Sequence, residues 1–348
     1  MRLGGSLALP IPSGFEFFHS LRFGVVIGQC PCHKGEVFMR ALSRRNFLKK
    51  STSLAAGAAA LGWSRVLFSA GPDLKFPTQP RDRLSVASYP FRAFIESPRN
   101  WNRDRKKRGM DLKDFAAMVV KKFHVHNIEP LGEHFRSTDP AYVQALKKAK
   151  AQVVNIPVSV GASLYDPDAA KRKRGIQNSK KWVDIAVTLG SPSIRIHIQA
   201  VKSVSPDIDR TAESLSEIAT YGAEKGILVN LENDDLLSED AFFLVKVIEK
   251  VNNPYLHALP DFGNSMLSGN EQFNYDAVTA MFKHAYNICH VKDSEIDKGK
   301  IFRVDLCKTF AIAKASGYRG YFSMEWEGQG GPYEGTQKLI DASLKCLA

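Results

Sequence analysis

Four residues whose side chains can bind a metal ion each stand at the end of an apolar segment with the composition of a buried strand. The segments cover residues 226–232, 255–261, 286–290 and 320–325, and the residues that end them are Glu232, Asp261, His290 and Glu325. Parallel α/β proteins place functional side chains where the carboxyl ends of their strands meet. One such residue could be an ordinary polar boundary, but four on consecutive strands predict a metal site.

The donor types indicate which ion and which chemistry to expect. Three carboxylates and one imidazole suit a single divalent ion such as manganese, magnesium or cobalt, with zinc also acceptable. Such an ion stabilises the enediolate that forms when a proton is removed next to a carbonyl, and two carboxylates can remove and return that proton. Glu232 and Glu325 are our candidates for this acid/base pair. Lys292 either supports the developing oxyanion or is a solvated loop lysine.

These residues need a scaffold in which strands and helices alternate. Four earlier strand-like segments, at residues 84–89, 127–131, 152–158 and 193–198, bring the total to eight, at spacings of about 25 to 40 residues. The pattern predicts a single (β/α)8 TIM barrel, of the α/β class, over residues 84–348. An open doubly wound sheet is the alternative, but no Gly-x-Gly-x-x-Gly follows the first strand.

Two basic runs and two helices complete the expected barrel. Residues 103–108 and 171–174 are expected to be solvated loops. A helix is expected from about residue 176 to 189, after the second basic run, and another from 274 to 285.

The sequence around the four ligand candidates resembles the xylose-isomerase-like barrels, in particular the sugar-phosphate isomerase/epimerase group. The motifs are Val-Asn-Leu-Glu-Asn at 229–233, Asp-Phe-Gly-Asn at 261–264, His-Val-Lys-Asp at 290–293 and Met-Glu-Trp at 324–326. The resemblance extends from residue 84 to the C-terminus. It implies that the four residues are the metal ligands and that Glu232 and Glu325 act on opposite sides of the substrate. Several epimerases of the group carry histidine where this chain has Asn264, so substrate selection is expected to differ.

Further residues are candidates for contact with the substrate, each with a structural role as its alternative. Arg195 and His197 share one face of the fourth strand. Glu129 ends the second strand, Asn264 follows the sixth, and Trp326 directly follows Glu325.

We therefore expect an enzyme, a metal-dependent sugar isomerase or epimerase whose partner is a small-molecule sugar. One alternative is a lyase or dehydratase acting on a keto-sugar, keto-inositol or oxidised glycoside, and another is a non-catalytic sugar-binding barrel. Endonuclease-IV-type enzymes share the barrel but need a histidine-rich multi-zinc cluster. The ligand series here has one histidine, so no nucleic-acid partner is expected. Association into a homo-oligomer is left open.

The N-terminal region resembles a twin-arginine export signal. Arg44 and Arg45 are followed by Phe47 and Leu48, and then by a weakly apolar, Ala- and Gly-rich stretch at 53–68. We expect residues 39–70 to be this signal and 71–83 a linker. Residues 1–38 are a disordered extension or a mis-assigned start, because Met39 stands just before the Arg pair. The translocation machinery is then a partner, and the protein is periplasmic or otherwise exported. It keeps no stable membrane span after processing, because no apolar run approaches about 20 residues.

Charge and cysteine content agree with this division. The formal net charge is +12, but residues 1–70 hold nine basic and two acidic residues, so more than half of the excess belongs to the leader. Cys30 and Cys32 lie in the extension, which leaves Cys289, Cys307 and Cys346. An odd number without paired spacing predicts no disulfide framework.

Overall fold

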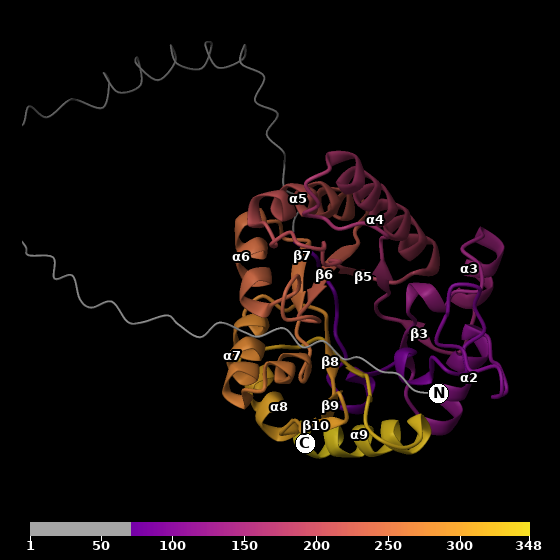
Figure 1. Cartoon of the computed structure of the whole chain (residues 1–348). Coiled ribbons are helices and arrows are strands. Elements are labelled where there is room, and N and C mark those ends of the chain that lie inside the picture. Colours follow the sequence, from indigo (N-terminus) through magenta and orange to yellow (C-terminus); the bar gives the residue numbers. More distant parts are fainter. Residues whose placement is uncertain (1–70) are drawn as a thin grey trace, which may run out of the picture. The chain divides into compact units, whose positions relative to one another are not determined.

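The structure is a computed structural model that describes residues 71–348. The expected extension, the twin-arginine segment and Cys30 and Cys32 lie outside the described residues. Figure 1 shows the helices of the described part arranged around the strands.

The strands form a parallel barrel, as predicted. They are β1 (Leu84–Ala87), β2 (Asn127–Glu129), β3 (Gln152–Val153), β4 (Pro157–Ser159), β5 (Ser193–His197), β6 (Leu228–Glu232), β7 (Leu256–Leu259), β8 (Ile288–Val291) and β11 (Tyr321–Met324). Hydrogen bonds order them as β3-β2-β1-β11-β8 and β4-β5-β6-β7, with every pair parallel. Parallel bridges from Ala258 to Ala285 and from Asp261 to His290 join the two groups on one side. On the other side, the expected third strand is divided into β3 and β4.

The helices alternate with these strands. They are α2 (Leu112–Phe123), α3 (Pro140–Lys147), α4 (Ala169–Leu189), α5 (Ile208–Lys225), α6 (Ala241–Val251), α7 (Glu271–Phe282), α8 (Leu306–Ala315) and α9 (Pro332–Leu347). Most begin at a side chain that accepts a backbone N–H of the first turn, which satisfies otherwise unpaired donors. These caps are Asp111, Asp168, Asp207, Asp240, Asn270 and Asp305. Within residues 71–348, no helix combines the length and the apolar character that a membrane span requires.

The core lies between the strands and this outer layer of helices. All residues of β1, β6, β8 and β11 are buried. This is typical of parallel strands that are covered on both faces. The polar residues of these strands are therefore enclosed by protein, and each needs a partner or a function.

The expected boundaries of two helices were wrong. Helix α4 begins at Ala169, so the basic run at 171–174 lies in its first turns and not in a loop. The Asp168 side chain explains this start, because it accepts the N–H groups of Ala170 and Lys171. Helix α7 begins at Glu271, three residues earlier than expected, and ends at Phe282. The run at 103–108 does lie in a loop.

The sequence did not predict an antiparallel hairpin between β8 and α8. Its strands are β9 (Ser294–Asp297) and β10 (Lys300–Arg303). The turn contains Lys298 and Gly299, both with positive φ, which glycine adopts without steric cost.

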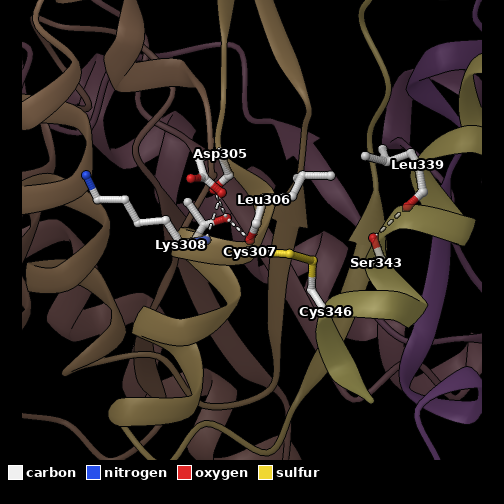
Figure 2. The surroundings of a disulfide bond; sticks show 8 residues. Asp305, Leu306, Cys307, Lys308, Leu339, Ser343 and Cys346 are labelled. Atoms are coloured by element: carbon white, nitrogen blue, oxygen red, sulfur yellow. Dashed lines mark hydrogen bonds between the residues drawn. A yellow bond between two sulfur atoms is a disulfide. The ribbon is translucent and has the colours of Figure 1, made fainter.

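The prediction that the cysteines form no disulfide was also wrong. Cys307, in the first turn of α8, is bonded to Cys346, in the last turn of α9, across 39 residues of sequence. Figure 2 shows the bond between the two helices, beside the Asp305 cap and the Ser343 hydroxyl, which donates to the Leu339 carbonyl. Two neighbouring helices bring the cysteines together, and sequence spacing carries no record of that contact. Cys289 is the free, buried cysteine of the described residues.

Candidate metal centre and active site

The four predicted ligand residues meet at one point at the C-terminal ends of β6, β7, β8 and β11. Glu232, Asp261, His290 and Glu325 each offer a ligand atom, and these atoms all lie within 4.8 Å of one another. All four residues are buried. They come from consecutive strands because parallel strands of a barrel present their carboxyl ends at one mouth.

A hydrogen bond to Glu129 sets the orientation of the His290 ring. Its Nε2 lies 2.9 Å from Glu129 Oε2. A carboxylate can only accept, so Nε2 carries the proton of this bond. Its Nδ1 then faces the cluster, 2.9 Å from Glu232 Oε1 and 3.2 Å from Glu325 Oε2. Glu129 in turn accepts a hydrogen bond from Asn155 Nδ2 at 2.7 Å. This is the carboxylate–histidine arrangement that orients a metal-binding imidazole.

Asp261 shows why the cluster fits a cation. Its Oδ1 accepts the backbone N–H groups of Gly263 and Asn264, at 2.8 and 2.7 Å, whereas its buried Oδ2 has no hydrogen-bond partner. Burial raises the pKa of Asp261 to about 8; Lys292 opposes this rise, and the nearby carboxylates of Glu232 and Glu325 add to it. Lys292 Nζ lies 3.7 Å from this oxygen, beyond hydrogen-bond distance, and a buried carboxylate oxygen without a hydrogen bond is costly unless a cation comes closer. The donor set therefore fits a divalent metal ion.

Lys292 is a buried cation and not a solvated loop residue. Its Nζ lies 2.7 Å from Asn264 Oδ1 and 2.7 Å from Glu327 Oε2. Burial alone would lower its pKa, but Asp261, Glu327 and further carboxylates raise it well above the usual value. Asn264 also donates to Glu232 Oε1 at 3.2 Å, so it links Lys292 to the ligand cluster.

Arg195 and His197 lie together on the other side of Glu232. Arg195 Nε is 2.9 Å from Glu232 Oε2, and one of its terminal nitrogens is 2.6 Å from Asp234 Oδ2. His197 Nδ1 is 2.7 Å from Glu239 Oε2. Burial lowers the pKa of His197, but the neighbouring carboxylates of Asp234 and Glu239 raise it to about 10. Arg195 and His197 are therefore two cationic partners for three carboxylates, those of Glu232, Asp234 and Glu239.

A cavity of about 320 Å³ opens above the cluster. Among the predicted site residues, its walls include Arg195, His197, Glu232, Asn264, His290, Lys292 and Glu325. Two expected substrate contacts lie elsewhere. Glu129 is fully buried behind His290, and Trp326 packs against Gly335 of α9 so closely that a Cβ there would clash with its indole. Both occupy supporting positions and do not line the cavity.

Sequence reasoning missed several residues of this site. They are Tyr89, Asp234, Glu239, Glu295 and Glu327. Asp234 and Glu327 each lie two residues beyond a ligand glutamate, and that spacing is a usable signal. Glu239 resembled part of a helix cap because it precedes the capping Asp240. Glu295 comes from the unpredicted β9–β10 hairpin, 3.3 Å from Lys292 Nζ.

The fold and the cluster together define a TIM barrel with a buried Glu–Asp–His–Glu group at the C-terminal ends of its strands. Residues 116–348 match the family described as the xylose isomerase-like TIM barrel. The chain belongs to this family, as the sequence resemblance implied. A search of curated proteins finds no match.

Solved structures have the same fold at low sequence identity. D-psicose 3-epimerase from Clostridium cellulolyticum H10, with D-tagatose, is 16% identical with a TM-score of 0.55, covering 76% of this chain and 96% of that one. The 3-keto-D-glucoside 4-epimerase YcjR from E. coli is 13% identical with a TM-score of 0.53, covering 68% and 95%. A xylose isomerase-like protein from Mycobacterium smegmatis in complex with magnesium is 15% identical with a TM-score of 0.56, covering 76% and 97%. Sugar epimerases are thus among the structural neighbours.

Proposed function

We propose that this protein is a divalent-metal-dependent sugar isomerase or epimerase that moves a proton on the carbon next to a carbonyl. The observation that carries the proposal is the convergence of Glu232 and Glu325 on one cluster at the wall of one cavity. Sugar epimerases among the structural neighbours support the same class of reaction.

Glu232, Asp261, His290 and Glu325 would hold the metal, with manganese, magnesium or cobalt expected and zinc acceptable. A bound divalent ion supplies Lewis-acid stabilisation for the negative charge that develops on the substrate oxygens. The magnesium complex among the neighbours supports a hard divalent ion.

The chain's own residues supply the proton transfers. Burial would raise the pKa of Glu232, but Arg195 and His290 more than offset it and lower that pKa, so Glu232 is available as a base. Glu325, on the strand beyond His290, returns the proton. Lys292 donates a hydrogen bond toward the developing oxyanion, while Asn264 and Glu327 hold its amine in place.

The test is metal analysis of the full-length chain beside the Glu232→Gln/Glu325→Gln double variant. We expect about one divalent ion per chain, lost in the variant, and solvent-deuterium incorporation into at least one sugar of a panel of ketoses and keto-glycosides. Absence of metal even after reconstitution would contradict the proposal. Bound metal without exchange on any sugar would favour the non-catalytic sugar-binding barrel.

A lyase or dehydratase is the second candidate, because the cavity contains groups that a simple epimerisation does not use. Tyr89 and Glu327 both line the cavity. Burial raises the pKa of the Tyr89 phenol, so it remains protonated and can donate to a leaving oxygen. Detection of an unsaturated sugar product in the exchange assay would select this reaction.

We also propose that residues 39–70 direct export through the twin-arginine pathway and that residues 71–83 link them to the barrel. The Arg44–Arg45 segment supports this, and so does the Cys307–Cys346 disulfide, because disulfides persist mainly in oxidising compartments.

A further inference from the structure

A second, larger cavity adjoins the catalytic cavity. Its volume is about 940 Å³, compared with about 320 Å³ for the catalytic one. Glu133 and Ser159 line both cavities, so they share a wall at the C-terminal ends of β2 and β4. We call the larger one the outer groove; the wall residues used below are Arg99, Trp101, Arg105, Glu133, Ser159 and Trp182. The two cavities are therefore neighbours that meet at Glu133 and Ser159.

The outer groove presents side chains that have no partner within the described residues. Trp101 is 85% exposed, and no aromatic ring or cation of residues 71–348 stacks on it. Arg105 makes no ion pair within the same range. By contrast, the Arg99 guanidinium lies 5.6 Å from the Trp182 ring centre and donates to the Gly132 carbonyl.

The loop that carries Trp101 is held by its own side chains. Asn100 Nδ2 donates to the carbonyls of Arg92 and Ile95, both at 2.8 Å. The Ser97 hydroxyl donates to the Glu133 carbonyl at 2.6 Å, which fixes the loop to the shared wall. The exposed indole is therefore presented by an ordered loop, and surface loops on a rigid barrel are where binding residues are found.

We propose that the outer groove binds a second sugar ring attached to the reacting one, so that the substrate is a glycoside of at least two rings. An indole offers a wide apolar face that fits the C–H face of a pyranose, and guanidinium groups donate to its hydroxyls. This inference rests on the proposed function. When the reacting ring is the one joined through its anomeric carbon, that carbon is an acetal and carries no free carbonyl. The reacting carbonyl is then a ring ketone, and the substrate class is a keto-glycoside. Contacts to the distant ring raise kcat/KM at the reacting one.

The test compares solvent-deuterium exchange on cellobiose oxidised to a ketone at C3 of its non-reducing ring with exchange on methyl 3-keto-glucoside. The full-length chain is measured beside Trp101→Ala, with Val187→Ala, exposed on α4, as the matched control. We expect kcat/KM for the disaccharide to exceed that for the methyl glycoside by about tenfold or more, and Trp101→Ala to remove most of this ratio. The proposal would be overturned if the ratio of kcat/KM for the disaccharide to that for the methyl glycoside were the same in the unaltered chain, Trp101→Ala and Val187→Ala.

A binding measurement separates this inference from the proposed function. If neither the keto-disaccharide nor methyl 3-keto-glucoside exchanges, the proposed function fails. Calorimetric titration with unoxidised cellobiose and methyl glucoside then tests whether the outer groove binds a second sugar ring. Tighter binding of cellobiose that weakens in Trp101→Ala supports it. Equal binding of both sugars overturns it. A changed oligomeric state of Trp101→Ala in light scattering, without a change in sugar affinity, also overturns it and makes the groove a contact between chains.

Discussion

At the scale of single residues, the ligand cluster depends on groups that are not candidate ligands themselves. Glu129 fixes the His290 ring, Asn155 fixes Glu129, and Asn264 holds Lys292 against Glu232. These contacts decide which nitrogen and which oxygen face the ion, so altering them should weaken metal binding without removing a ligand.

Glu129→Gln tests this directly. The neutral amide is a weaker partner for His290 Nε2–H, so we expect metal affinity to fall by about 10- to 100-fold. Competition with a chelator measures the affinity, and Glu217→Gln, a change of an exposed carboxylate that pairs with Lys180, is the control. An unchanged affinity in Glu129→Gln would show that His290 is oriented without this carboxylate.

His134 is expected to make stability dependent on pH. It is fully buried beside the Ser88 hydroxyl, 2.7 Å from its Nδ1, and burial lowers its pKa to about 3. Between that value and the unfolded pKa near 6.5, the unfolded chain binds more protons, so stability rises with pH and falls on acidification. Between pH 7 and pH 5 this pKa difference lowers the free energy of unfolding by about 2 kcal/mol.

Urea unfolding at both pH values measures this loss. In His134→Asn the decrease should be smaller by that amount, whereas His126→Asn, at an exposed position, should behave as the unaltered chain does. Parallel pH profiles for all three proteins would contradict the assignment of the effect to His134.

At the scale of elements, segments outside the regular barrel complete the site. The β9–β10 hairpin places Glu295 beside Lys292, and the segment after β11 adds Glu327. Helix α9 follows that segment, and its Gly335 backs Trp326. The position of α9 therefore affects the positions of Glu325 and Glu327, which flank Trp326 in the cavity wall.

The disulfide between α8 and α9 should stabilise this wall. It closes a loop of 39 residues, so the Cys307→Ser/Cys346→Ser double variant should unfold with a free energy lower by about 3–4 kcal/mol. Urea unfolding under oxidising conditions measures this, and the unaltered chain with a reductant should approach the variant. Equal midpoints for the oxidised chain and the double variant would show that the bond adds no stability.

At the scale of the whole molecule, the proposed export signal and the disulfide of the barrel both favour an oxidising compartment. An exported barrel meets oxidising conditions in which Cys307 and Cys346 can pair, and a retained one meets thiol reductants. Net charge agrees with this division, because most of the basic excess lies before residue 71.

Replacement of Arg44 and Arg45 by lysine should abolish export. In cell fractions, the unaltered protein should be exported with Cys307 and Cys346 protected from thiol reagents. The Lys-Lys variant should stay inside the cell with both cysteines labelled. Export of the variant at the normal level would contradict the twin-arginine assignment.

The barrel and the four ligand candidates could be predicted from the sequence. Both follow from local patterns: apolar segments of strand length separated by amphipathic ones, and a ligand-type residue where each segment ends. In a parallel barrel the strand ends share one mouth, so order along the chain was enough to predict convergence of Glu232, Asp261, His290 and Glu325.

The surroundings of these ligands could not be predicted, because they depend on contacts between distant parts of the chain. The Glu129–His290 bond joins residues 161 apart, and the Cys307–Cys346 bond joins helices whose contact leaves no periodic signal. Glu239 precedes the Asp240 cap and Glu295 lies in a hairpin that the sequence did not predict, and packing places them beside Arg195 and Lys292. Such pairings depend on distances between elements. Those distances are set by side-chain packing across the whole barrel, which no local pattern encodes.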